Sequence, residues 1–464
     1  MSRARPRLRA RARLSLALSL SISLWACARF PVNPPLERWS PERPTLTSPH
    51  RRDDLLFLLA FSGGGTRAAA FAYGVLEELR DTQVAIGGRP RPLLDEIDFV
   101  SGVSGGSFVA AYYGLHGDGI FRDFEARFLR RNVQRDLVLA LLNPVNWVRL
   151  ASPLFARSDL AAEYYDRRIF DGATFADLAR GPGVEVVINA TDLVRGNRFS
   201  FRQSELDYLC ADLAPIHLAR AVAASSAIPG LLTPVLLRSY AGTCGFEPPA
   251  WIAQTLETRE GSRRRLRQAE VLSSYLDPSR RFVHLLDGGI ADNLGVRFSF
   301  EQTVEQGGFY EMLERAGLTN TRQILMVVVN AETEPELPAR ESGILVAGLA
   351  TLLRTVSGIQ IRTANFETIE LVRTSFEEWA RDLSSRRGHP VQFRLADLSF
   401  DALPDPAERA YLRNLPTSLA LDGEAVDRLR AAGRKLVRTS AVVRDAIAQM
   451  AELPANEESE ERKP

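Results

Sequence analysis

Ser104 lies in the pentapeptide Gly102-Val103-Ser104-Gly105-Gly106, which fits the pattern G-x-S-x-G. In that pattern a serine stands in a strained turn between a strand and a helix, and its small neighbours make room for it. The helix N-terminus behind such a serine favours negative charge on a reacting carbonyl group. A short strand is expected at Ile97–Val100, and an apolar helix is expected to end near Leu115. Ser104 is therefore a candidate nucleophile, the alternative being an ordinary glycine-rich turn.

A second glycine-rich segment follows the apolar run Leu55-Leu56-Phe57-Leu58-Leu59-Ala60-Phe61. Gly63, Gly64 and Gly65 leave backbone N–H groups bare, and such groups can hold an oxyanion or a phosphate. The lysine of a P-loop is missing, and Ala68 stands where the dinucleotide fingerprint has its last glycine. The alternative is close packing of a helix on a strand, which also needs small residues.

Asp287-Gly288-Gly289 follows the apolar segment Phe282–Leu286, which is expected to be a strand. A carboxylate at the carboxyl end of such a strand lies where active sites of open α/β sheets form. An aspartate near a serine can accept its proton while the serine attacks a carbonyl. An aspartate–glycine turn is also a common structural element, so this motif gains weight only beside the other two.

The three motifs in this order, each at the end of a strand, resemble the patatin-like phospholipases. Further similar segments are Phe71–Leu76, Ala224–Gly230 and Asp287–Gly295. The resemblance covers roughly residues 54–300, and the leader described below resembles that of a bacterial lipoprotein.

The resemblance implies a role for each site residue. Ser104 would be the nucleophile, Asp287 its general base without a histidine, and the amides of Gly63, Gly64 and Gly65 the oxyanion hole. Arg67 would steady the loop or a phosphate head group. The supporting small residues would be Gly102, Gly105, Gly106, Gly288 and Gly289.

The implied activity is hydrolysis of lipid carboxylic esters, of the phospholipase A or lysophospholipase kind, through an acyl-enzyme and without a metal or other cofactor. Two alternatives stay open. A Ser-His-Asp triad esterase would need His389, the one histidine after Asp287. An inactive lipoprotein could instead bind lipid or a protein partner.

The composition is that of a globular protein with a large core: 45% of the 464 residues are hydrophobic and 25% are charged. A net charge of +1 favours no nucleic-acid partner. Alternating strands and helices predict one α/β domain over residues 54–450, a three-layer α/β/α fold with a mostly parallel central sheet. Residues 451–464 are charged and expected to be a disordered tail.

The N-terminal residues 1–26 are expected to be a lipoprotein-type signal peptide. An arginine-rich start is followed by the apolar run Leu14–Trp25, which is shorter than the roughly 20 residues of a membrane span. Cys27 would be the lipidated residue, and residues 27–53 a proline-rich tether. Anchoring in the bacterial outer membrane, facing the periplasm, is the expected location; an uncleaved anchor or a plain secretory signal are the alternatives.

Two other features leave alternatives open. Cys210 and Cys244 are expected either to pair, as in an exported protein, or to be buried thiols. The apolar stretch 136–155 is expected to be a cap helix packed on the core, the alternative being a lipid-facing flap. The oligomeric state is not predicted by any of these patterns.

Overall fold

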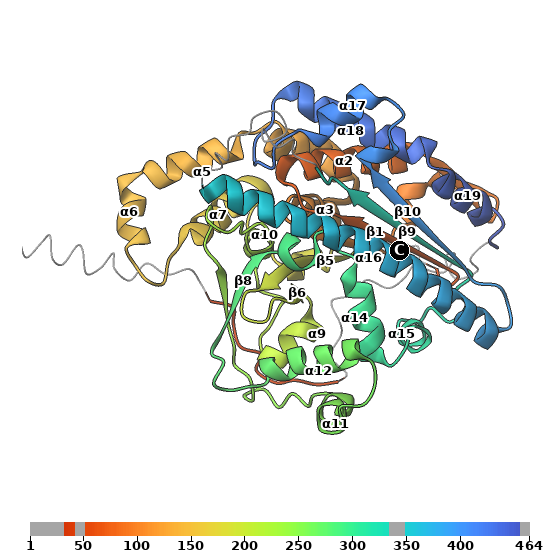
Figure 1. Cartoon of the computed structure of the whole chain (residues 1–464), viewed down its shortest axis with the longest axis horizontal. Helices are drawn as coiled ribbons and strands as arrows, with labels where there is room; N and C mark the ends of the chain where they lie inside the picture. Colours follow the sequence, from red (N-terminus) through yellow and green to blue (C-terminus); the bar gives the residue numbers. More distant parts are fainter. Residues whose placement is uncertain (1–31, 42–51, 334–348, 455–464) are drawn as a thin grey trace, which may run out of the picture.

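The computed structural model describes residues 32–41, 52–333 and 349–454 (Figure 1). Its centre is an eight-stranded sheet in the order β10-β9-β1-β4-β5-β8-β7, with β6 also paired to β5. The strands from β10 to β5 are mutually parallel, whereas the β5–β6, β5–β8 and β7–β8 pairs are antiparallel. The strands of this sheet are β1 (Leu55–Phe61), β4 (Phe99–Val103), β5 (Glu185–Asp192), β6 (Arg198–Ser200), β7 (Val235–Arg238), β8 (Phe282–Asp287), β9 (Gln323–Asn330) and β10 (Gln392–Ser399).

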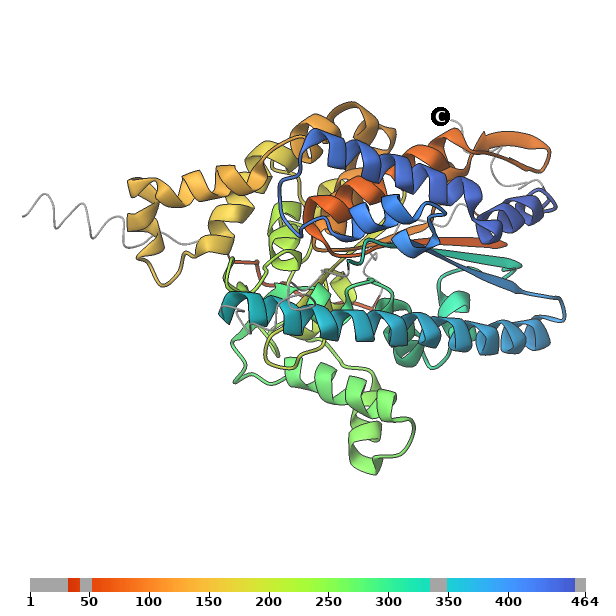
Figure 2. The same ribbon diagram turned by 45° about the horizontal axis from the view of Figure 1, so that its top comes forward.

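Helices cover both faces of the sheet (Figures 1 and 2). Successive residues of a strand point to opposite faces. Accordingly, Phe57 and Leu59 of β1 join a core with the helices α2, α3, α18 and α19, while Leu56 and Ala60 join a second core with α14, α15 and α16. This arrangement confirms the predicted three-layer α/β/α fold with a mostly parallel sheet.

The α-helices differ widely in length, from single turns to the 39 residues of α16. Within the described ranges, no helix combines the length and the apolar character that a membrane crossing requires. The helices are α2 (Gly65–Asp81), α3 (Gly105–His116), α4 (Ile120–Phe124), α5 (Val133–Leu142), α6 (Pro144–Leu150), α7 (Arg157–Tyr165), α8 (Phe175–Leu178), α9 (Gln203–Leu206), α10 (Leu218–Ser225), α11 (Ala250–Thr258), α12 (Arg263–Tyr275), α13 (Gly289–Asp292), α14 (Arg297–Gln306), α15 (Phe309–Arg315), α16 (Leu349–Arg387), α17 (Pro406–Arg413), α18 (Gly423–Thr439) and α19 (Ala441–Met450).

The apolar runs Leu55–Phe61 and Phe282–Leu286 form strands where the sequence predicts them, with ends shifted by at most one residue. The strand expected at Ile97–Val100 begins at Phe99 and continues to Val103. The pattern does not predict β7 or β10. Strand β7 has only four residues, and β10 is an edge strand that carries Arg394 and Asp397 among its apolar residues.

Most of the stretch 136–155 does not pack on the core as expected, although Leu137 contacts the core and Phe155 is buried. It forms α5, α6 and the turn after α6, and α5–α6 projects from the body of the molecule (Figure 1). Only Val133 of the two helices is buried. We call this the α5–α6 hairpin. Its exposed apolar side chains, with that of the following turn, are Val138, Leu139, Leu142, Val145, Trp147, Val148 and Leu154. Amphipathic spacing predicts the helices but does not specify what covers their apolar side.

Residues 32–41, which belong to the expected tether, dock on the domain. The Leu36 amide donates to the Cys210 carbonyl at 2.7 Å, and the Trp39 amide donates to the Cys244 carbonyl at 2.9 Å. Cys210 and Cys244 form a disulfide with a Cα–Cα distance of 5.5 Å. At the other terminus Leu453 is buried, so the packed chain reaches beyond residue 450. The expected signal peptide, Cys27 and residues 455–464 lie outside the described residues.

Candidate active site

Ser104 sits in the turn that joins β4 to α3. Its backbone has φ 49° and ψ −118°, a conformation that L-residues rarely adopt. The conformation is held from two sides: the Ser104 amide donates to Ser225 Oγ at 2.8 Å, and the Ser107 hydroxyl donates to the Ser104 carbonyl at 2.6 Å. The turn therefore has the strained geometry expected of a nucleophile elbow.

Asp287 reaches the same place from a strand of opposite direction. Strand β8 is antiparallel to β5. If the two strands overlapped fully, the carboxyl end of β8 would lie beside the amino end of β5, away from Ser104. They pair only through Asp287 with Ala190 and the next two positions. In the neighbouring pair Val103 lies opposite Asn189, so Ser104, Ala190 and Asp287 follow in a row across three strands. The short overlap places the carboxylate beside the elbow.

The two side chains form a hydrogen-bonded pair. The Ser104 hydroxyl donates to Asp287 Oδ2 at 2.9 Å, and the Gly289 amide donates to Asp287 Oδ1 at 2.8 Å. Both residues are buried, with 4% and 8% of their surface exposed. Burial raises the pKa of Asp287 to about 6, against the lowering effect of these two hydrogen bonds. At neutral pH the carboxylate is ionised and basic enough to take a proton from the serine.

The loop with Gly63, Gly64 and Gly65 lies against the elbow. A Cβ atom at Gly105 would meet the Gly65 carbonyl oxygen at 2.0 Å, and one at Gly63 would lie 3.4 Å from Ser104 Cβ. Gly64 and Gly65 have φ of +140° and +60°, which favours glycine. Gly63 was expected to supply an oxyanion-hole amide, but its amide already donates to the Asn293 carbonyl at 3.0 Å. Within the described chain the Gly64 and Gly65 amides have no such acceptor, so they remain able to bind an oxyanion.

Arg67 is buried in the first turn of α2 and its guanidinium holds the loop to other elements. Nε donates to the Ala331 carbonyl at 3.0 Å, and Nη1 donates to the Leu415 carbonyl at 2.8 Å. Burial lowers the pKa of Arg67 to about 10, which leaves it charged at neutral pH. With only 3% of its surface exposed, Arg67 is placed to steady the loop and not to meet a phosphate in solvent.

The other predicted small residues lie where backbones approach each other closely. A Cβ at Gly106 would stand 2.5 Å from the Phe61 carbonyl, and one at Gly288 would stand 2.4 Å from the Asn189 carbonyl. At Gly102 and Gly289 the nearest atoms would be Ser107 Cα at 2.7 Å and Asn293 Oδ1 at 2.9 Å. Any side chain at these positions would separate β1, β4 and β8 or move the loops between them.

Three polar residues outside the predicted catalytic motifs connect the two halves of the site. The Ser225 hydroxyl accepts from the Ser104 amide and donates to the Asn189 carbonyl at 2.6 Å. The Thr191 hydroxyl donates to the Asp287 carbonyl at 2.8 Å. All three are buried. Ser225 lies in the segment Ala224–Gly230 that carries the family resemblance, which was the available signal; Asn189 and Thr191 lie in an apolar strand without a motif.

The described histidines make no contact that would complete a triad, although His284 lies on β8, the strand that ends at Asp287. Neither Ser104 nor Asp287 has a hydrogen bond to any of them. His389 precedes β10 and therefore lies at the amino end of the parallel strands, whereas Ser104 lies at the carboxyl end. The eight residues of β10 span roughly 25 Å, so His389 cannot complete a triad in this fold. Among the described residues no cluster of histidine, cysteine and acidic side chains could hold a metal ion.

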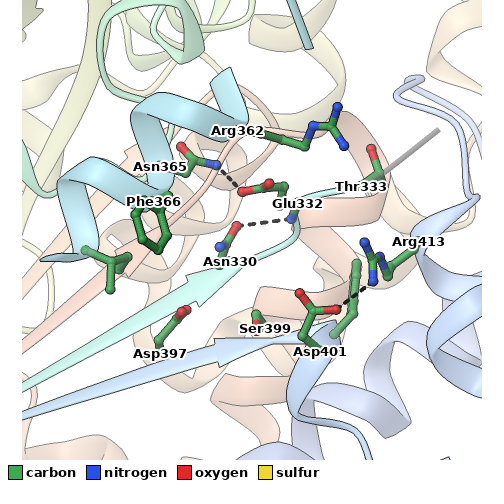
Figure 3. A pocket seen from close by; sticks show the side chains of 12 residues that line it. Asn330, Glu332, Thr333, Arg362, Asn365, Phe366, Asp397, Ser399, Asp401 and Arg413 are labelled. Carbon is green, nitrogen blue, oxygen red and sulfur yellow. Dashed lines mark hydrogen bonds and ion pairs between the residues drawn. The ribbon is translucent and has the colours of Figure 1, made fainter. Parts of the chain in front are cut away.

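A polar pocket of about 200 Å³ opens at the carboxyl ends of β9 and β10, and its lining does not include Ser104 or Asp287. Figure 3 shows Asn365 of α16 pointing to Glu332, where Nδ2 donates to Oε2 at 2.6 Å. Asp401 accepts from Arg413 at 2.8 Å. Burial, with Glu332 and Asp401 nearby, raises the pKa of Asp397 to about 6. Burial also raises the pKa of Glu332, so several carboxyl groups besides Asp287 have an elevated pKa at this end of the sheet.

Comparison with known proteins gives one family match. The model of the patatin-like phospholipases matches residues 59–298, just over half of the chain, and this range holds Ser104, Asp287, the glycine loop and Arg67. No curated protein sequence matches the chain.

Solved structures with similar folds include human GIVD cytosolic phospholipase A2, VipD from Legionella pneumophila and the type III effector protein ExoU. Their identities to the chain are 13%, 11% and 16%, and their TM-scores are 0.40, 0.32 and 0.23. The alignments cover 86%, 91% and 87% of this chain, and 63%, 71% and 79% of those chains. With TM-scores this low, the assignment rests on the family match. The chain belongs to the patatin-like phospholipase family.

Proposed function

We propose that the chain hydrolyses carboxylic esters of membrane lipids, in the manner of a phospholipase A or lysophospholipase, through Ser104 and Asp287. The observation that carries the proposal is the 2.9 Å hydrogen bond from the Ser104 hydroxyl to a buried carboxylate whose pKa is raised to about 6. Membership in the patatin-like phospholipase family supports lipid esters as the substrate class.

The reaction would take two steps. Ser104 Oγ attacks the ester carbonyl while its proton passes to Asp287 Oδ2, and the resulting oxyanion is stabilised by the amides of Gly64 and Gly65 at the start of α2. Asp287 then returns the proton to the leaving alcohol. In the second step Asp287 takes a proton from water, and the hydroxide attacks the acyl carbonyl on Ser104. The bond between the acyl carbon and Ser104 Oγ then breaks, Asp287 returns the proton to Oγ, and the fatty acid leaves.

The same proposal includes the cellular location, an exported lipoprotein held by Cys27 in the outer membrane and facing the periplasm. The Cys210–Cys244 disulfide supports an oxidising compartment. The membrane anchor would keep the enzyme on the surface that holds its substrate.

The test is mass spectrometry of the lipid products. The purified full-length chain is incubated with mixed phospholipid vesicles, and the matched control is Ser104→Ala. Free fatty acids and lysophospholipids that form with the parent and are absent with Ser104→Ala support the proposal. Product formation at equal rates in both samples, or none in the parent, contradicts it.

A further inference from the structure

The exposed large apolar side chains of the described chain gather at the carboxyl end of the sheet, where Ser104 lies. Leu193 and Val194 follow β5, Leu231 follows the segment that holds Ser225, and Ile290 comes three residues after Asp287. Ile359 and Phe366 of α16 also lie at this end of the sheet. The nearby Asn365 fixes this part of the helix there, because it is hydrogen-bonded to Glu332, which follows β9. An apolar surface that surrounds a reactive site is typical of a contact with another apolar phase.

The α5–α6 hairpin extends this surface outward (Figures 1 and 2). Its start is fixed beside the glycine loop, since the Gln134 amide donates to Leu419 and the Thr66 amide donates to the neighbouring Ser418. Leu139, Leu142 and Trp147 are 56%, 61% and 58% exposed. The sequence has no charged residue from 137 to 148.

Polar side chains at the turn between α5 and α6 form hydrogen bonds with the hairpin's own backbone. Trp147 Nε1 donates to the Leu141 carbonyl at 2.7 Å, and Asn146 Nδ2 donates to the Ala140 carbonyl at 2.8 Å. Asn143 Oδ1 accepts from the Val145 amide at 3.0 Å. These three donors can therefore leave water with their hydrogen bonds kept.

The N-terminal segment begins on the same side. Asn33 Nδ2 donates to the carbonyl of Arg238, which lies opposite Phe282 in the β7–β8 pair. Since β8 overlaps β5 only by its last residues, Phe282 extends beyond the carboxyl end of β5. Cys27 stands five residues before Val32, and five residues span at most about 18 Å. A lipid on Cys27 would hold this face close to the bilayer.

We propose that this face docks on a phospholipid bilayer and that the α5–α6 hairpin inserts Leu139, Leu142 and Trp147 into its interfacial region. The inference rests on the proposed function, because a lipid ester must pass from the bilayer to Ser104. The occupant is a bilayer and not a second copy of the chain, since the short link to Cys27 and the substrate both place lipid on this side. An amphipathic hairpin of this kind lies in the membrane plane with its apolar side buried.

Tryptophan quenching tests the contact without reference to activity. The full-length chain, as Ser104→Ala so that the lipid is not consumed, is bound to phosphatidylcholine–phosphatidylglycerol vesicles with plain or brominated acyl chains. Trp147→Phe in the same background is the matched control, and the difference between the two emission spectra isolates Trp147. Brominated lipid is expected to remove at least about half of that difference. An equal difference in both lipids would show that Trp147 stays out of the bilayer and would overturn the proposal.

Kinetics supply the second arm. Leu139→Asp puts a charge on the hairpin, and Ser385→Asp puts the same charge on an exposed position of α16 near the opposite end of the sheet. The ratio of vesicle turnover to turnover of a soluble short-chain ester should fall about tenfold or more in Leu139→Asp and should stay at the parent value in Ser385→Asp. An unchanged ratio in Leu139→Asp, or a dimer that this substitution dissociates, contradicts docking on lipid. A parent that cleaves neither ester contradicts the proposed function, and the quenching result then still decides the docking.

Discussion

The Ser104 hydroxyl donates to Asp287 Oδ2 at 2.9 Å although the two residues are 183 positions apart and lie on strands of opposite direction. The contact depends on the register Ala190–Asp287, because a shift by one residue would turn the carboxylate to the other face of the sheet. The proposed chemistry of the site thus depends on the register in which β8 pairs with β5.

Turnover should depend on pH through Asp287. The basic form of Asp287 is needed, and burial raises its pKa to about 6, so kcat/KM for a soluble ester should rise with pH through an inflection near 6 and then level off. The measurement is a pH–rate profile of the parent chain between pH 4.5 and 8.5, an interval of about two units on each side of that value.

Asp397 is the control for this assignment. Burial raises its pKa to about 6 as well, but it has no contact with Ser104. The inflection should persist in Asp397→Asn. Its disappearance in that variant would assign the titration to Asp397 and contradict the role of Asp287.

Asp287→Asn should stabilise the fold above pH 6 while it abolishes turnover. A carboxyl group whose folded-state pKa is raised from 3.8 to about 6 costs stability once it is ionised. The cost is absent below pH 3.8, grows between pH 3.8 and 6, and reaches roughly 3 kcal/mol above pH 6. Urea unfolding of both proteins at pH 4 and pH 8 measures it. An equal free-energy difference at the two pH values would argue against the raised pKa.

Ser104→Gly should be more stable than Ser104→Ala. The backbone conformation at φ 49° strains any residue with a Cβ, whereas glycine adopts it freely, and such strain is worth roughly 1–3 kcal/mol. Both variants lose the hydroxyl, so the difference between their free energies of unfolding isolates the strain. At a position without strain the alanine variant would be the more stable of the two. That result for Ser104→Ala would contradict a strained elbow.

Ser225→Ala should slow turnover without changing KM greatly. The Ser225 hydroxyl is hydrogen-bonded to the Ser104 amide and to the Asn189 carbonyl, and so positions the nucleophile. A nucleophile that is no longer held in position lowers kcat on the order of 10–100-fold. Steady-state kinetics with a soluble ester give kcat and KM separately. Thr191→Val, which removes the bond to the Asp287 carbonyl, should act in the same direction; a parent-like kcat in Ser225→Ala would show that the bond does not position the nucleophile.

The sequence predicts those strands and turns that depend only on residues close together in the chain. Apolar runs predict β1 and β8, and the turn motifs identify Ser104, Asp287 and the glycine loop because strained or crowded backbones require particular residue types at fixed spacing. The direction of β8 is not visible in its residues, since an apolar strand reads alike whether its neighbours are parallel or antiparallel. Asp287 was expected at the correct edge of the sheet, but the structure reaches it through an antiparallel strand.

Local sequence patterns also do not predict which elements pack against each other. The α5–α6 hairpin has the apolar spacing of core helices, and only the fold shows that Leu142 and Trp147 face outward. Asn189 acts through a bond to a segment far from it in the chain, so no spacing predicts it, and for Ser225 the segment Ala224–Gly230 was the signal. The histidines illustrate the opposite case: His389 follows Asp287 in sequence, but β10 carries it to the other end of the sheet.

The dyad is tested most directly by the rate at which a fluorophosphonate labels the purified full-length chain, with the labelled peptide identified by mass spectrometry. The parent should carry the label on Ser104, Asp287→Asn should be labelled on the order of 10²–10⁴ times more slowly, and His389→Ala should be labelled at the parent rate. Labelling of Asp287→Asn at the parent rate, or loss of labelling in His389→Ala, would contradict a serine activated by aspartate alone.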